Sequence, residues 1–335
     1  MAMASDWIAT LAADLRAMAH EAPTRGEAFA AWRSGEKGTR RHECAQEAAR
    51  KAASELLRSD VEEQVRMEAC WEACFEAQRC HAGKMQVLGL AGAQKMAAHA
   101  AMTPAQFRQM RDALPKLAKS GDGQVQLRTL QVLLTMLQVQ QEVQERAEGV
   151  AMEVAMQLRA NRKDPAVKSA ADATVRQAVA CALEGMEMDK AGNPWDNKRN
   201  GSTKEAPAQH PAQETSGETM ADTRKPNRDQ LDIARARGEE LVYGMVQDLI
   251  TMAGEGTPVF LDAPALPRKQ ALELLEMALQ HHAHTLQQSK RILHGLLRRR
   301  LAPLLHTVLL KAADRNHLSD VHEGDEFAAA FHNRG

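Results

Sequence analysis

The stretch GQVQLRTLQVLLTMLQ, residues 123–138, decides the fold class. Within it, leucines 127, 130, 134 and 137 recur at spacings of three, four and three residues. This is the spacing of one face of an α-helix, whereas the residues on one face of a strand recur at every second position. The stretch therefore predicts a helix with one strongly apolar face.

Similar spacing continues on both sides of this stretch. Trp7, Leu11, Leu15 and Met18 follow one another at spacings of four, four and three. Thr103 and Pro104 have the residue types of an N-cap and a first helical position. Further helices are predicted near residues 61–75, 85–98, 143–158 and 167–186, with breaks at 121–123 and 161–165. The charged residues 25–50 are assigned no helix. About six helices joined by short turns predict an antiparallel helical stack.

Residues 189–230 contain no Val, Ile, Leu or Phe. Such a stretch cannot offset the entropy lost on ordering, so a disordered linker is predicted there. It divides the chain into a first helical block (1–188), a second helical block (231–314) and a frayed tail (315–335). The second block has predicted helices at 241–252, 268–280 and 289–311, with a Gly- and Pro-rich break at 254–267. Pro303 is expected to kink or split the last of them.

The composition narrows both the fold class and the class of function. Hydrophobic residues make up 44% of the chain but aromatic residues only 3%, so the core must consist of Ala, Leu, Met and Val. The formal net charge of −1 gives no overall field to attract nucleic acid. No uncharged apolar run approaches 20 residues, so membrane contact is expected to be peripheral. Five cysteines without framework spacing suit a reducing cytoplasm.

No catalytic, cofactor or metal site is predicted. Cys70, Cys74, Cys80 and His81 lack the paired spacing of structural zinc sites, and buried packing is the stronger interpretation. The histidines at 281, 282 and 284 are interpreted as a solvated helix end. Residues 254–258 resemble a phosphate loop only superficially, because no Lys-Ser/Thr pair follows, and a turn is predicted instead.

The densest basic patch consists of Arg298, Arg299 and Arg300. A solvated helix face is one interpretation of this patch. The other is a surface for an acidic partner or for anionic lipid headgroups, where each exposed cation adds about 1 kcal/mol.

A family resemblance rests on four strings that occur in family order. GQVQLRTLQVLLTMLQ, the later DPAVKSAADATVRQAVACALEGM (164–186) and the earlier KMQVLGLAGAQKMAAHAAMTP (84–104) resemble the dimerisation and cyclophilin-binding (DCB) domain of Mon-two and the large Arf exchange factors. After the linker, ELVYGMVQDLITM (240–252), with ALELLEMALQ and LLRRRLAPLL, resembles the start of the homology-upstream (HUS) region. The second block is more similar to the Mon-two branch.

The resemblance implies an armadillo- or HEAT-like all-α fold and a non-catalytic scaffold in vesicle traffic at the Golgi and endosomes. The implied partners are a second copy of the chain, an Arf-like GTPase and a Dopey-type protein, and the implied location is cytoplasmic with peripheral attachment to these membranes. Lys95, Arg128 and Gln131 are the partner-binding residues it suggests, and all three are expected to be exposed. Two alternatives stay open: an N-terminal regulatory fragment of a large Arf exchange factor, and a generic helical-repeat adaptor.

Overall fold

The structure is a computed structural model that describes residues 3–22, 36–56, 58, 60–80, 82–143, 146–160, 164–191 and 228–310. Every regular element in these ranges is a helix, and they contain no strand. The predicted all-α class and helical stack are confirmed. Most of the predicted linker 189–230, and all of the predicted tail 315–335, lie outside the described residues. None of the described helices is long and apolar enough to cross a membrane.

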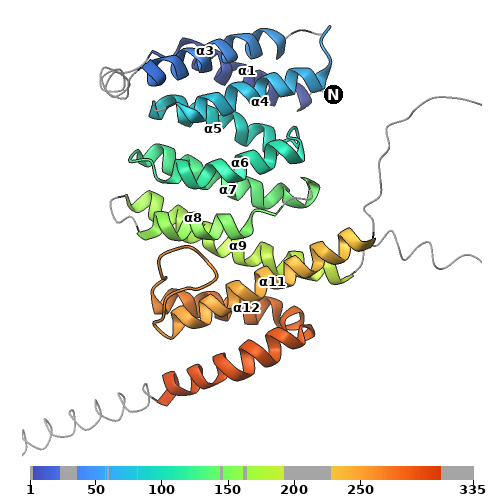
Figure 1. The fold of residues 1–335 in the computed structure, drawn as a ribbon, viewed down its shortest axis with the longest axis vertical. Coiled ribbons are helices and arrows are strands. Elements are labelled where there is room, and N and C mark those ends of the chain that lie inside the picture. The colour runs from blue at the N-terminus through green and yellow to red at the C-terminus, as the bar shows by residue number, and fades with distance from the viewer. Residues whose placement is uncertain are drawn as a thin grey trace, which may run out of the picture. The chain divides into compact units, whose positions relative to one another are not determined.

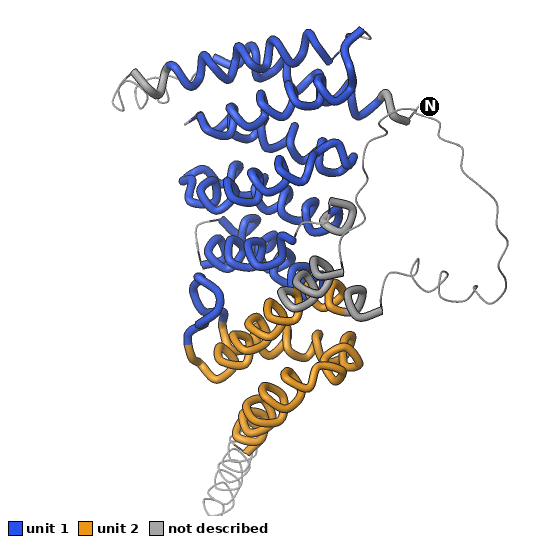
Figure 2. The backbone as a smooth tube through the Cα atoms, turned by 45° about the vertical axis from the view of Figure 1, so that its right-hand side comes forward, with its two compact units in different colours: residues 1–181, 257–266 blue, residues 182–256, 267–335 orange. Residues whose placement is uncertain are grey.

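The chain forms two compact units, drawn in different colours in Figure 2. The first comprises residues 1–181 and 257–266, and the second comprises residues 182–256 and 267–335. The first unit contains α1 (Met3–His20), α3 (Glu36–Leu56), α4 (Glu63–Arg79), α5 (Gly83–Ala98), α6 (Pro104–Ala118), α7 (Gly123–Val143), α8 (Glu148–Ala160) and the start of α9 (Pro165–Ala191).

Successive helices of the first unit lie in layers, as Figure 1 shows. Helix α1 packs on α3 and α5, α3 packs on α4, and α4 packs on α5. Further along, α5 packs on α7, while α6, α7 and α8 contact one another. The segment 257–266 also belongs to this unit: the amide of Asp262 donates to Glu153 of α8 at 3.3 Å, and Gln157 donates to the Asp262 carbonyl at 3.2 Å.

The core is built mainly from alanine, leucine, methionine and valine, as predicted from the scarcity of aromatic residues. Phe107 and Trp71 are the aromatic side chains that the described residues bury. In α1 the predicted stripe is confirmed at Leu11, Leu15 and Met18, which are fully buried, whereas Trp7 is half-buried. In α7 the predicted leucine stripe is only partly buried: Leu130 and Leu137 are buried, whereas Leu127 and Leu134 are half-buried. The buried face also includes Val125, Val132, Leu133 and Met136, because this helix has neighbours on several sides.

Helix α3 was not predicted, because its stretch was interpreted only as charged. Its buried residues are mostly alanines: Ala45, Ala49, Ala52 and Ala53, followed by Leu56. Their spacing of four, three, one and three is helical. Alanine contributes little to a hydrophobic pattern but has the highest helix propensity. The predicted start of a helix at residue 143 was also wrong, since α7 ends at Val143 and α8 begins at Glu148.

Two local features of the first unit follow from single residues. Thr103 is the N-cap of α6: its hydroxyl accepts from the Gln106 amide, and the Gln106 side chain accepts from the Thr103 amide, which completes a capping box with Pro104 as the next residue. Helices α4 and α5 touch through Gly89. A Cβ atom there would lie 2.7 Å from the Cys74 carbonyl oxygen, so only glycine permits this approach.

The second unit contains α11 (Arg228–Ala253), α12 (Arg268–Gln288) and the π-helix η1 (Arg291–Leu301), which contact one another. The turn predicted at 254–258 is confirmed: Glu255 has a φ of 66°, and Gly256 follows it. Helix α12 runs past its predicted end at residue 280 through a kink at His282. After η1 the chain is α-helical at residues 302–310, so the helix continues through Pro303 and its irregular part precedes the proline.

Candidate protein-binding site

A cleft of about 560 Å³ lies within the first unit, between α3, α4, α5 and α6. Helix α4 forms one wall through Phe75, Gln78, Arg79 and the following Cys80. Helices α3 and α5 contribute one residue each, and α6 closes the opposite side. The volume is within the usual range of ligand-binding clefts in proteins.

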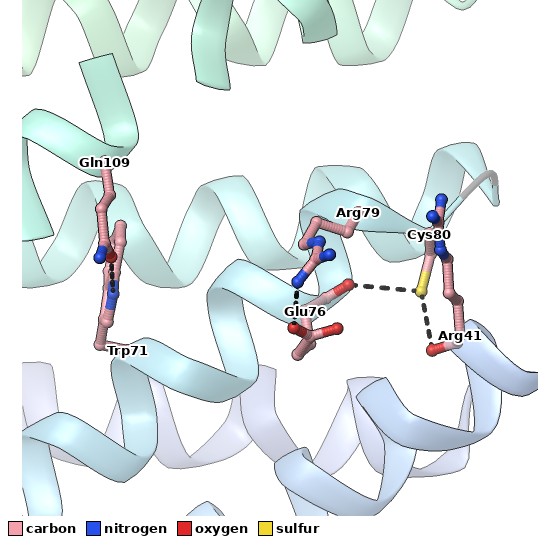
Figure 3. A network of polar contacts seen from close by, with 6 residues as sticks. All are labelled: Arg41, Trp71, Glu76, Arg79, Cys80 and Gln109. Atoms are coloured by element: carbon pink, nitrogen blue, oxygen red, sulfur yellow. Dashed lines mark hydrogen bonds and ion pairs between the residues drawn. The ribbon is translucent and has the colours of Figure 1, made fainter. Parts of the chain in front are cut away.

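Hydrogen bonds hold the end of α4 in place beneath this cleft. The Gln86 side chain donates to the carbonyls of Cys80, at 2.7 Å, and Gln78, at 3.3 Å. The Cys80 thiol donates to the carbonyls of Arg41, at 3.4 Å, and Glu76, at 3.5 Å, and so joins α3 to α4 (Figure 3). These bonds fix the main chain that carries the lining residues.

The same wall is fastened to α6 through an aromatic side chain. The Trp71 indole N–H donates to Gln109 Oε1 at 3.1 Å (Figure 3). The Trp71 ring stacks on Phe75 with centroids 5.5 Å apart, and the Arg79 guanidinium lies 6.0 Å from the Phe75 ring centre. The half-buried Phe75 ring thus forms a supported apolar surface in a cleft that is also lined by several polar side chains.

The charged residues that line the cleft are predominantly basic. Arg41, Arg79 and Lys116 stand against one carboxylate, Asp112. Asp112 is itself paired with Arg111 at 3.1 Å, and Arg79 is paired with Glu76 at 2.8 Å. Three lining cations against one lining anion favour an anionic ligand, although the chain as a whole is nearly neutral.

Gln78 is the unusual member of the lining. Its side chain is only 4% exposed, and neither its Oε1 nor its Nε2 atom has a hydrogen-bond partner among the described residues. Buried polar groups in native proteins are nearly always paired, because an unpaired group loses its hydration without compensation. Both amide atoms are themselves enclosed, so a ligand in the cleft reaches this donor group and this acceptor only when the side chain turns outward.

The cysteines of this region are structural. Burial raises the pKa of the Cys80 thiol to about 12, and burial also raises that of Cys70 to about 12 and that of Cys74 further. Such thiols remain protonated at neutral pH and are poor nucleophiles. The packing predicted for these three cysteines agrees with their burial; His81 lies outside the described residues. The described residues hold no group of three or more potential ligands suited to a metal ion.

The residues predicted to bind partners lie elsewhere in the first unit and are half-buried, so the expected exposure was wrong. Lys95 pairs with Asp14 of α1 at 2.6 Å and donates to the Thr10 carbonyl. Arg128 donates to the Gln94 side chain at 3.1 Å, across the contact between α5 and α7. Gln131 is on the same helix as Arg128, and its carbonyl accepts from Thr135. Lys95 and Arg128 therefore take part in contacts between helices.

The predicted basic patch is in the second unit, and it is exposed as an interaction surface requires. Arg298, Arg299 and Arg300 form the last turn of η1, and the chain continues after them as an α-helix. Arg291, at the other end of η1, is stacked over the Tyr243 ring at 4.3 Å. The solvated helix end predicted at His281, His282 and His284 was wrong in part, because α12 continues to Gln288 and His282 is buried, while His281 and His284 are exposed.

Sequence comparison agrees with a protein-binding domain. A family model described as Mon2/Sec7/BIG1-like, dimerisation and cyclophilin-binding domain, matches residues 2–190, more than half of the chain. The chain belongs to this family. The DCB domain is a non-catalytic domain for dimerisation and cyclophilin binding, so residues 2–190 are expected to self-associate and to bind other proteins. Searches of curated proteins and of solved structures found no match.

The cleft was not found by sequence reasoning. Glutamines on charged helices such as α4 are usually solvated, and no spacing rule distinguishes Gln78 from an exposed glutamine. The only signal was indirect. Gln78 is four residues after Cys74 and one after Ala77, two fully buried residues, which places it at the edge of the buried face of α4.

Proposed function

We propose that this chain is a non-catalytic scaffold or regulator of vesicle traffic at the Golgi and endosomes, which acts by holding partner proteins on its helical surfaces. The observation that carries the proposal is the DCB match over residues 2–190. A stack of helices is suited to this role, because stacking produces extended binding surfaces.

The proposed partners are a second copy of the chain, an Arf-like GTPase and a Dopey-type protein. Self-association is supported by the nature of the matched domain. The other two follow from the resemblance to the Mon-two branch. That resemblance includes the HUS-like strings, of which 240–252 lies in α11 and 271–280 lies in α12.

Peripheral membrane attachment is part of the same proposal. The exposed patch of Arg298, Arg299 and Arg300 has no carboxylate among its own residues, and exposed cations add about 1 kcal/mol each near an anionic bilayer. The chain as a whole has no excess of basic charge, with 43 basic against 44 acidic residues. The patch would therefore direct attachment.

The scaffold proposal is tested first by mass and by partner capture. Light scattering after size exclusion should give a multiple of the chain mass of 36.8 kDa. Pull-down should recover more Arf-like GTPase in the GTP-loaded than in the GDP-loaded state. A strictly monomeric chain with no nucleotide-dependent capture would contradict the proposal. A reading frame that continues into a Sec-seven catalytic domain would favour the regulatory-fragment alternative.

The location is tested with a tagged chain in a eukaryotic cell. We expect Golgi and endosomal signal that becomes diffuse when Arg298, Arg299 and Arg300 are all changed to Glu. The control changes one exposed arginine of the first unit, Arg16→Glu, and should leave the location unchanged. Diffuse signal for the unmodified chain would contradict the proposed location. Unchanged signal in the triple variant would show that the basic patch does not direct the location.

A further inference from the structure

We infer that the cleft between α3, α4, α5 and α6 binds an extended acidic peptide segment of a partner protein. This inference rests on the proposed function only in taking the domain to be protein-binding. It assigns a particular site and a particular partner chemistry, neither of which follows from the DCB match.

The carboxamides in the lining favour a peptide main chain. Gln78 has an unpaired N–H donor group and an unpaired carbonyl acceptor, which are enclosed at the cleft wall and meet a peptide when this side chain turns outward. Gln86 uses its NH₂ group on two carbonyls, which leaves its Oε1 atom to accept, and Gln109 uses its Oε1 atom on Trp71, which leaves its NH₂ group to donate. A peptide backbone presents alternating N–H and C=O groups that match these three side chains.

The charges of the lining favour acidic side chains on that peptide. Arg41, Arg79 and Lys116 outnumber the one lining carboxylate, and Arg41 and Lys116 are exposed, so they remain hydrated and accessible. Charges at the rim of a binding site steer the approach of the ligand and select its sign. Phe75 adds a half-buried ring that an apolar side chain of the segment can cover.

The size and rigidity of the site favour a short segment over a folded surface. A volume of about 560 Å³ accommodates a few residues of extended chain, whereas a folded partner would use a broad flat surface. The α4 end is fixed by the Gln86 and Cys80 hydrogen bonds, so the main chain of the site is in place before the segment arrives. Such preorganisation lowers the ordering cost of binding.

The test uses random 12-residue peptides displayed on phage and selected against the full-length chain, with selected sequences synthesised and their binding measured by fluorescence polarisation. We expect enrichment of Asp and Glu, binding that weakens with added salt, and at least about tenfold weaker binding when the acidic residues of the peptide are replaced by their amides. Selection of neutral or basic peptides would overturn the proposal.

Three variants assign the binding to the cleft. Affinity for the selected peptide should fall at least about tenfold in Gln78→Met and in the double variant Arg79→Glu with Lys116→Glu. In Arg16→Glu the affinity should change less than about twofold. Circular dichroism melts establish that each variant is folded. Equal binding by folded Gln78→Met and the unmodified chain would overturn the proposal. Failure of the GTPase or localisation tests leaves this peptide measurement unaffected, so the two proposals fail separately.

Discussion

Replacing Gln78 by methionine is expected to stabilise the first unit. The Gln78 side chain is 4% exposed and has two unpaired polar atoms, and each unpaired buried group costs about 1–3 kcal/mol of folding free energy. Methionine keeps the unbranched shape and adapts easily to its surroundings. We expect the free energy of unfolding to rise by about 1–3 kcal/mol, equivalent to roughly 2–4 °C in Tm for each kcal/mol.

Gln126 provides a matched control in the same unit. It is also buried, at 6% exposure, but its Nε2 atom donates to the Ser120 carbonyl at 2.7 Å and to the Ala118 carbonyl at 3.3 Å. Gln126→Met removes these bonds and leaves the two carbonyls without this donor, so the Tm of the variant should be a few degrees lower. Thermal melts followed by circular dichroism measure both. If Gln78→Met were as destabilising as Gln126→Met, the Gln78 amide would be satisfied in the folded chain and the reasoning would be refuted.

Four further predictions concern the packing of the first unit. Gly89→Ala should lower the free energy of unfolding by about 1–3 kcal/mol in denaturant titration, because the new methyl group meets the α4 backbone, and an unchanged midpoint would show that the two helices can separate freely. Burial raises the pKa of the Cys80 thiol to about 12, so the unfolded chain releases this proton near pH 9 and the folded chain near pH 12. Between these values the free energy of unfolding should fall by about 1.4 kcal/mol per pH unit, and it should fall less steeply in Cys80→Ala. Equal slopes in the two proteins would contradict this prediction. In native protein, a thiol reagent should label only Cys44 rapidly; fast labelling of a second cysteine would contradict the burial of the others. Lys95→Glu should lower the free energy of unfolding by about 1–2 kcal/mol through repulsion of Asp14, whereas Lys95→Met should lower it less. Equal melting temperatures for the two variants would show that the charge at this position is not the cause.

Much of the helical stack could be predicted because its helices have leucine and methionine at helical spacing. The α6 start was predictable from Thr103 and Pro104 alone, since cap chemistry is local. Helix α3 was missed because its buried face is almost entirely alanine. Alanine at spacings of three and four is as periodic as leucine but changes the local hydrophobicity little, so a helix of this kind is recognised only when alanine positions are counted separately.

The candidate site could not be predicted, because its features depend on contacts between helices that are distant in sequence. Nothing local to Gln78 shows that its amide is unpaired, and nothing local to Lys95 shows that Asp14, 81 residues earlier, neutralises it. Residues suggested by family resemblance, such as Arg128, are part of the α5–α7 contact in this fold. Sequence pattern identifies which face of a helix is buried, whereas polar pairing depends on which helices become neighbours.

In the cleft, close packing of small residues fixes the main chain around Gln78. Gly89 allows the α5 backbone to contact α4 beside Cys74 and Ala77, and Gln86 binds the main chain at Gln78 and Cys80. The main chain at Gln78 is thereby fixed, while its side chain is left without a partner. The backbone at Gln78 is ordered by interactions made during folding. A peptide that binds the Gln78 amide therefore does not pay the entropy of ordering that backbone. A stabilised Gln78→Met that no longer binds acidic peptide would be the result expected if this unpaired amide lowers stability in return for binding.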